Sequence, residues 1–294
     1  MSSGTEAAMT SRVIEYLGPL ISNIQRVSRY ATLTAAGVSL YDYETDLFWS
    51  SNGDRQFHAA STIKLAVMLG AFKAVEEGII DLSDQLHVRN RFLSAADKTP
   101  YHVENSRDGD TEVYQRIGRT MSIDELVELM IIRSSNLATN LLVDFLGAEY
   151  IQRVLQKAGA QNIYLKRGVE DHRAFNQGIN NEVTANGLVQ VLRAIYEPYF
   201  FSTASRDRML EVLLKQNFNS MIPAALPSDV RVAHKTGEIS TVSHDVGLVF
   251  VPNRKPYILA ILTEFVPGKE NHAQPLAGIS LAVYEFLMRQ TLER

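Results

Sequence analysis

The sequence predicts an α/β protein whose antiparallel sheet is assembled from both ends of the chain, with an all-α lobe inserted between them. Strand-like runs occur at residues 35–50 and 230–263, and helical periodicity dominates the middle and both termini. Because helices and strands bury their apolar faces against one another, we expect the terminal helices to pack on the sheet. The predicted sheet lobe comprises residues 1–60 and 217–294, and the all-α lobe comprises residues 61–216.

The segment up to Gly78 contains two predicted helices and a hairpin. Apolar residues recur at helical spacing over residues 11–30, which indicates an amphipathic helix. Alternation over residues 35–50, interrupted by a short polar turn, is typical of a hairpin. Residues 61–76 form a strongly apolar stretch ended by Gly78, and we expect it to be the buried central helix.

An irregular segment follows over residues 89–118, which carries glycines, a proline and a charged run. We interpret it as a long loop near the mouth of the site. Ser122 followed by Glu125 is a capping box, which opens a helix to about Arg133. Further helices are predicted over residues 136–146, 150–157, 184–197, 205–216 and 274–291, and strands over 230–239, 245–251 and 257–263.

The composition excludes several classes of protein. The chain has 294 residues, 46% hydrophobic and 21% charged, with a net charge of −4, as in ordinary globular proteins. Because 29 Lys and Arg are outnumbered by 33 Asp and Glu, nothing indicates a nucleic-acid partner. The absence of cysteine excludes disulfides, thiolate metal sites and a cysteine nucleophile. No stretch approaches the roughly 18 consecutive apolar residues of a membrane span.

The N-terminal 30 residues lack the basic segment and apolar core of an export signal, because Glu6, Arg12 and Glu15 interrupt them. We therefore expect a cytoplasmic protein, or a periplasmic or secreted one if an export signal has been removed. We also expect a monomer that acts on a small molecule without cofactor or metal. His58 and His172 lack a third ligand at a recognisable spacing.

Three short motifs occur in order: Ser61-Thr62-Ile63-Lys64, Ser134-Ser135-Asn136 and Lys235-Thr236-Gly237. A serine hydroxyl is a poor nucleophile at neutral pH and needs a proton acceptor within hydrogen-bond reach. On a helix, a spacing of three residues places the Lys64 amine on the same face as Ser61. Each motif alone has a structural alternative, such as a helix cap or a strand lysine. The ordered combination predicts a serine acyl-transfer site.

At these residues the chain resembles the class A β-lactamases and penicillin-binding-protein-like serine hydrolases, from about residue 12 to 292. The resemblance implies the class A β-lactamase fold, with the active site between the two lobes. It implies that Ser61 is acylated, that Lys64 accepts its proton and that Ser134 passes a proton to the leaving nitrogen. The backbone N–H groups of Ser61 and Glu238 would form the oxyanion hole.

The same resemblance implies the residues that bind substrate. Asn136 would bind the side-chain amide of the substrate, while Lys235 and Thr236, on the strand that continues through Gly237, would bind its carboxylate. The implied reaction is hydrolysis of a β-lactam. An alternative is a peptidase or esterase acting on D-amino-acid peptides or small esters. A second alternative is a penicillin-binding module that acylates and then stalls.

One further residue would decide whether the acyl-enzyme is hydrolysed. Class A β-lactamases carry a glutamate on a loop about 36 residues past the serine of the middle motif, and Glu170 stands at this position. It is a candidate base for activating water. The alternative is a surface glutamate beside Asp171 and Arg173. The family loop usually reads Glu-x-x-Leu-Asn, whereas here Ala174 replaces the asparagine and Asn176 comes two residues later.

Other departures from the family pattern concern two positions that are commonly charged in the family and the length of one interval. Ser135 stands where the middle motif commonly has aspartate, and Asp245 stands where many β-lactamases have a carboxylate-binding arginine. His234 and His244 lie close to that position and would either be structural or contribute a hydrogen bond or charge. The interval between the first two motifs is longer than usual, and residues 89–118 contain the excess.

Overall fold

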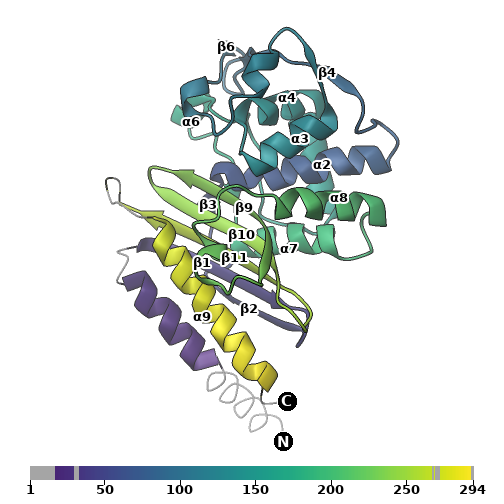
Figure 1. Ribbon diagram of the computed structural model, residues 1–294. Helices are drawn as coiled ribbons and strands as arrows, with labels where there is room; N and C mark the ends of the chain where they lie inside the picture. Colours follow the sequence, from purple (N-terminus) through teal and green to yellow (C-terminus); the bar gives the residue numbers. More distant parts are fainter. Residues whose placement is uncertain (1–16, 30–32, 267, 269–271, 293–294) are drawn as a thin grey trace, which may run out of the picture.

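The computed structural model describes residues 17–29, 33–266, 268 and 272–292 (Figure 1). Its main sheet is antiparallel and has the strand order β2-β1-β11-β10-β9, so strands from both ends of the chain lie side by side. These strands are β1 (Leu33–Asp42), β2 (Leu47–Ser51), β9 (Arg231–Ile239), β10 (Val242–Phe250) and β11 (Tyr257–Phe265). The predicted hairpin and the assembly of the sheet from both ends are confirmed.

Helices cover both faces of this sheet. The helix over residues 17–29 and α9 (Ala273–Leu292) lie together on one face (Figure 1). On the other face α7 (Ala185–Tyr196) packs against β1 and β11. Consecutive residues of β11 alternate between the two cores: Leu259 is buried in the core with α9, and Ala260 in the core with α7. Residues 11–16, predicted to begin the first helix, lie outside the described residues.

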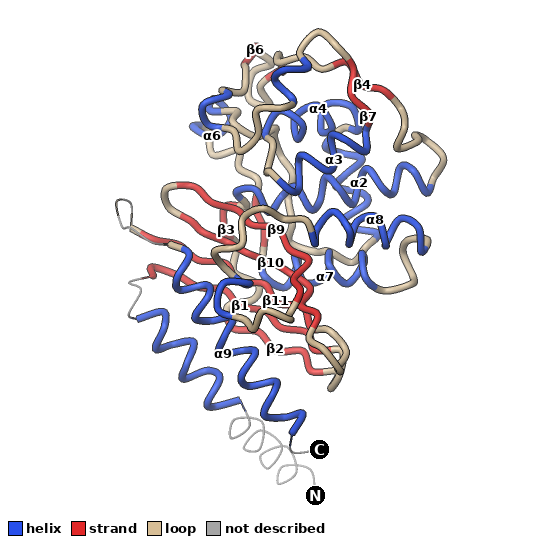
Figure 2. The backbone as a smooth tube through the Cα atoms, viewed as in Figure 1, coloured by secondary structure: helices blue, strands red, loops and turns tan. Residues whose placement is uncertain are grey.

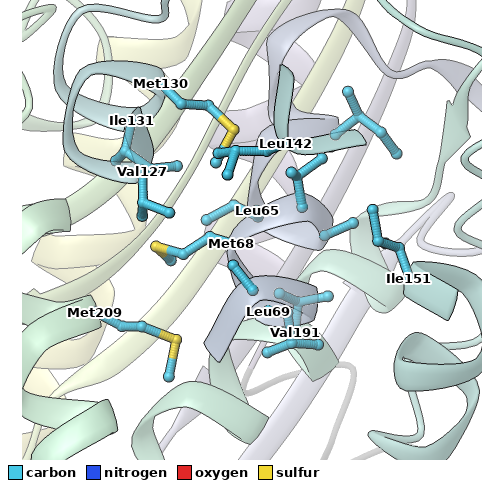
Figure 3. Close-up of a cluster of buried hydrophobic side chains, with 14 of the residues drawn as sticks. Leu65, Met68, Leu69, Val127, Met130, Ile131, Leu142, Ile151, Val191 and Met209 are labelled. Carbon is cyan, nitrogen blue, oxygen red and sulfur yellow. The ribbon is translucent and has the colours of Figure 1, made fainter. Parts of the chain in front are cut away.

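The helical part of the molecule surrounds α2 (Lys64–Glu76), in which ten of thirteen residues are buried. A helix that is apolar on all sides must be enclosed by its neighbours. Figure 3 shows Leu65 and Met68 among side chains from surrounding helices, including Val127 and Ile151. The remaining helices are α3 (Ile123–Ile132), α4 (Asn136–Leu146), α5 (Ala148–Lys157), α6 (His172–Asn176) and α8 (Thr203–Leu214). The predicted buried central helix is confirmed, whereas the two lobe boundaries stay a prediction.

Of two helix starts predicted from the sequence, one is confirmed and one differs. The capping box is present: Ser122 Oγ accepts from Glu125 N at 3.2 Å, and Glu125 Oε2 accepts from Ser122 N at 2.8 Å. The central helix differs from expectation, because a 3-10 turn, η1 (Ala60–Ile63), precedes the α-helix that begins at Lys64. Among the described residues, no helix is both long and apolar enough to cross a membrane.

Residues 89–118 form the predicted long loop, which lies at the end of the molecule remote from the termini (Figure 2). It contains short elements only: β5 (Phe92–Leu93), β6 (Pro100–Tyr101), η2 (Asn105–Arg107) and η3 (Val113–Arg116). Short strand pairs elsewhere join β4 (Gln85–His87) to β7 (Thr120–Ser122) and β3 (Phe57–His58) to β8 (Glu182–Val183), and η4 (Ile222–Ala225) precedes β9.

Candidate active site

The first motif lies where η1 passes into α2. Ser61 is half-buried on η1, and Lys64 is fully buried at the start of α2. Burial deprives the ammonium group of hydration and lowers the pKa of Lys64 to about 7, although the nearby carboxylates of Asp108 and Glu170 oppose the shift. A substantial fraction of this amine is therefore neutral at neutral pH, as a proton acceptor requires.

Lys64 connects the first motif to the middle one. Its Nζ donates to Ser134 O at 2.6 Å, to Ser134 Oγ at 3.0 Å and to Asn136 Oδ1 at 2.7 Å. Three acceptors match the three donors of an ammonium group. Within the described chain, Ser61 Oγ is not among the hydrogen-bond partners of Lys64. The resting contacts thus hold the amine beside Ser134.

Ser134 lies in the turn between α3 and α4 with φ of 57°, a left-handed conformation that serine rarely adopts. Such a conformation persists only where surrounding contacts hold it. Here Lys64 binds the carbonyl and hydroxyl oxygens, and Lys235 Nζ donates to Ser134 Oγ at 3.1 Å. Two lysine side chains thus contact the hydroxyl oxygen of Ser134.

The third motif lies on β9, an edge strand of the sheet. Burial and the neighbouring Lys64 hold the pKa of Lys235 well below its usual value. At Gly237 the strand backbone lies directly against the first motif, because an added Cβ would come within 2.9 Å of Ser61 N and 2.8 Å of Thr62 N. Only glycine permits this approach. It brings the Ser61 N–H close to the strand that continues into Glu238.

Glu170 joins the same cluster from the loop before α6. Its Oε1 accepts from Asn136 Nδ2 at 2.9 Å and its Oε2 accepts from Glu104 N at 3.3 Å. Asn140, one helical turn after Asn136, holds the preceding residue by accepting from Val169 N at 2.8 Å and donating to Val169 O at 3.0 Å. Glu170 therefore lies half-buried beside Asn136 and is not a freely solvated surface residue.

The residues that follow Glu170 depart from the family loop in a defined way. Asp171 is buried and accepts from Ser94 Oγ and Ala95 N at 2.8 Å, and from Ala174 N at 3.1 Å, which caps α6. Ala174 is buried without a polar side chain, and Asn176 is exposed at the end of α6. The side-chain amide that contacts Glu170 therefore comes from the middle motif and not from this loop.

The histidines near the third motif have structural partners. His234 Nδ1 lies 2.9 Å from Asp245 Oδ1, and Asp245 Oδ2 accepts from Ile222 N at 2.9 Å. His244 Nε2 donates to His58 O at 2.9 Å, and burial lowers the pKa of His244 to about 4. Position 245 therefore presents a buried carboxylate, and His244 is neutral at neutral pH.

Two residues that shape the site, Asp108 and Asn140, lie outside the three sequence motifs. Asn140 had a detectable signal, because residues four apart on a helix share a face, here with Asn136. Asp108 lay within a charged run that indicated only a loop, and its contacts with the start of α4 depend on tertiary structure. The half-buried Tyr101 of the same loop packs against this helix, with its hydroxyl 3.2 Å from Asn140 Nδ2.

Comparison with known proteins decides the family. The profile of the β-lactamase enzyme family matches residues 19–287. The β-lactamase ROB-1 of Haemophilus influenzae is 30% identical over 234 residues, which cover 77% of this chain and 71% of that protein. The chain belongs to the β-lactamase enzyme family. A β-lactamase of Bacteroides uniformis is 27% identical over 257 residues, covering 81% of this chain and 83% of that one.

Solved structures of the family agree in fold. A point mutant of PBP-A, solved as its acyl-enzyme complex with penicillin G, has a TM-score of 0.78 and 27% identity, covering 92% of this chain and 97% of that one. A β-lactamase from Sphaerobacter thermophilus has a TM-score of 0.75 and 26% identity, covering 93% and 97%. The predicted class A β-lactamase fold is confirmed.

Proposed function

We propose that this protein is a serine hydrolase that opens β-lactam rings through an acyl-Ser61 intermediate. Its membership of the β-lactamase enzyme family supports the reaction class. The observation that carries the assignment of roles is one continuous set of hydrogen bonds, which runs from Lys235 through Ser134, Lys64 and Asn136 to Glu170.

Acylation uses the first two motifs. Neutral Lys64 Nζ accepts the proton of Ser61 Oγ as this oxygen bonds to the ring carbonyl carbon. The N–H groups of Ser61 and Glu238 stabilise the oxyanion that develops. The carbon–nitrogen bond then breaks, Ser134 gives its proton to the ring nitrogen, and Lys64 returns a proton to Ser134. The ring nitrogen thus gains the proton that Ser61 lost.

Deacylation uses Glu170. Its carboxylate accepts a proton from water while the water oxygen bonds to the acyl carbon and the bond to Ser61 Oγ breaks. The proton then returns to Ser61, so one water is consumed for each ring opened. Asn136 serves a second role by binding the substrate's amide, and Lys235 with Thr236 binds its carboxylate.

The nucleophile is tested by Ser61→Ala. We expect no covalent adduct in intact mass spectra after incubation with penicillin G, and an unchanged circular dichroism spectrum. Ser202→Ala is the matched control, because Ser202 caps α8 outside the site and its loss should leave labelling intact. Labelling of Ser61→Ala at the wild-type rate would overturn the assignment.

A specific observation keeps the peptidase or esterase alternative in view. Position 245, where many β-lactamases have a carboxylate-binding arginine, is occupied by Asp245, which is buried against His234. Only Lys235 and Thr236 of the proposed residues would then bind the substrate carboxylate. Steady-state rates with a D-alanyl ester and with penicillin G, compared by kcat/KM, distinguish the two substrate classes.

The proposed site is built from a single chain, and we propose that the protein acts as a monomer. Light scattering coupled to size-exclusion chromatography tests this. The cytoplasmic location stays a prediction, which fractionation of cells expressing the chain would test.

A further inference from the structure

A carboxylate from the long loop lies at the first turn of α4. Asp108 Oδ1 accepts from Asn136 N at 2.9 Å, and Oδ2 accepts from Leu137 N at 3.0 Å. The first N–H groups of a helix have no partner within the helix and must be satisfied from outside. The neighbouring Ser135 accepts from Ala138 N, at 3.3 Å. Asp108 therefore completes the cap of α4 across 28 residues of sequence.

The loop holds Asp108 firmly in this position. Tyr114 donates its hydroxyl to Asp108 Oδ2 at 3.0 Å, and Asp110 N donates to Oδ1 at 3.2 Å. Burial raises the pKa of Tyr114, so its hydroxyl remains a donor. At Gly109 an added Cβ would lie 2.3 Å from Arg133 O, so the loop backbone is seated directly on the end of α3. This junction immediately precedes Ser134.

Asn136, whose backbone N–H is bound by Asp108, also links the side chains of Lys64 and Glu170. Asn136 Oδ1 accepts from Lys64 Nζ at 2.7 Å, and Asn136 Nδ2 donates to Glu170 Oε1 at 2.9 Å. A displacement of the Asn136 backbone would change both distances together. Small displacements of this kind are costly, because catalytic groups act only within a narrow geometry.

We infer that Asp108 is a positioning residue, which caps the first amides of α4 and thereby holds Asn136 between Lys64 and Glu170. The inference rests on the proposed function for the roles of Lys64 and Glu170. The middle motif, Ser134-Ser135-Asn136, has no carboxylate of its own. The long loop supplies one from another part of the chain.

The charges that face Lys64 predict an additional signature. The carboxylates of Asp108 and Glu170 raise the pKa of Lys64 against the effect of burial, whereas the charge of Lys64 lowers the pKa of the nearby Lys235. Removing the Asp108 charge removes one of the two interactions that raise the pKa of Lys64. The pKa of Lys64 should then fall further, and the Lys64 titration should move to lower pH.

The test compares Asp108→Asn with Asp110→Asn. Asp110 is buried in the same loop and accepts from Glu112 N, from Val113 N and from Arg133 Nη1 at the end of α3; in the part of the chain that the structure describes, it makes no hydrogen bond to α4. Two NMR measurements on the resting protein need no substrate: amide exchange at Asn136 and Leu137, and the pH titration of the Lys64 Cε resonance.

For Asp108→Asn we expect at least tenfold faster exchange at both amides and a titration midpoint at lower pH, because the cap and the charge are both weakened. Asp110→Asn should lower the melting temperature while leaving both NMR measurements unchanged. Wild-type exchange at Asn136 and Leu137 in Asp108→Asn would overturn the inference.

Activity then separates the inference from the proposed function. In Asp108→Asn, β-lactam turnover should fall about tenfold, and the acidic limb of the acylation profile should move to lower pH. If the wild-type protein acylates no β-lactam, the proposed function is overturned. If the amides of Asp108→Asn still exchange faster in that case, the positioning role of Asp108 stands.

If Asp108→Asn does not fold, Tyr114→Phe provides the second variant. It keeps the carboxylate and removes one donor that orients it. We expect the same two amides to exchange faster, by about threefold, with no change in the Lys64 titration. Unchanged exchange in Tyr114→Phe, when Asp108→Asn cannot be measured, would contradict the inference.

Discussion

Lys64 combines full burial with a lowered pKa. It is fully buried, and its nearest hydrogen-bond partners are neutral oxygens of Ser134 and Asn136. A buried ammonium without a directly bound counter-ion is expensive to keep charged, which explains why its pKa falls to about 7. The burial that lowers the pKa of Lys64 thus supports its proposed role as a base.

The lowered pKa of Lys64 predicts the pH dependence of acylation. Below about pH 7 the amine is protonated and cannot accept the Ser61 proton, so the acylation rate should rise with pH and level off above this value. Stopped-flow acylation by penicillin G between pH 5 and 9 measures the profile. A rate that is flat over this range would contradict the role of Lys64.

Glu170 is tested by an isosteric change. Glu170→Gln keeps the size of the side chain and removes its basicity, so deacylation should slow by roughly 10²–10⁴-fold, the usual contribution of a general base. Acylation should change by much less, and the acyl-enzyme should accumulate in intact mass spectra. The matched control is Glu211→Gln, which removes an exposed carboxylate of α8 that pairs with Lys215, and it should leave both steps unchanged.

An equal fall in the rates of acylation and deacylation in Glu170→Gln would argue against a role of Glu170 in deacylation alone. Selectivity is expected because the side chain of Glu170 is bound by Asn136 and by a backbone N–H of the long loop, and neither contact involves Ser61, the proposed nucleophile.

Single residues could be predicted from the sequence only in part. The three motifs identified Ser61, Lys64 and Ser134 as candidates, and the resemblance to the class A β-lactamases added Glu170. Asp108 was not predictable, because its partners become neighbours only when the loop folds over α3 and α4.

At the scale of elements, the approach of β9 to η1 sets the proposed oxyanion site. Gly237→Ala places a Cβ within 2.9 Å of Ser61 N and 2.8 Å of Thr62 N, and backbone atoms cannot rotate away. The strand must therefore shift, and we expect at least a tenfold loss in acylation rate, measured as the second-order rate constant for labelling by penicillin G.

The matched control for Gly237→Ala is Gly18→Ala. Gly18 lies in the N-terminal helix with no heavy atom within 4 Å of an added Cβ. Alanine is preferred over glycine inside a helix by roughly 0.5–1 kcal/mol, so this variant should be slightly more stable and label normally. Normal labelling in both variants would contradict the proposed position of the oxyanion hole.

Elements were predictable where one local rule dominates. The apolar residues of α2 predicted burial, and Ser122 with Glu125 predicted the start of α3. The 3-10 turn before α2 was missed because its four residues, Ala60–Ile63, are shaped by packing against β9 and β10 and not by propensity. Strand limits differed for a similar reason, since β10 begins at Val242 through pairing with β9.

At the scale of the whole molecule, the site exists because distant parts of the sequence converge. The first motif follows the first hairpin, the middle motif joins two helices, and the third motif lies on an edge strand near the C-terminal end of the sequence. Strands at both ends of the sequence and helices between them predicted this arrangement. The orientation of His234 toward Asp245 was not predictable, because it depends on which face of β9 meets η4.

The proposed reaction is repeated turnover of β-lactams through acyl-Ser61. The most direct measurement is incubation with a chromogenic cephalosporin, followed by absorbance and intact mass together. We expect many equivalents of ring-opened product per chain, with an adduct on Ser61 that disappears as substrate is exhausted. One equivalent of product with a persistent adduct, or no product and no adduct, would contradict the claim.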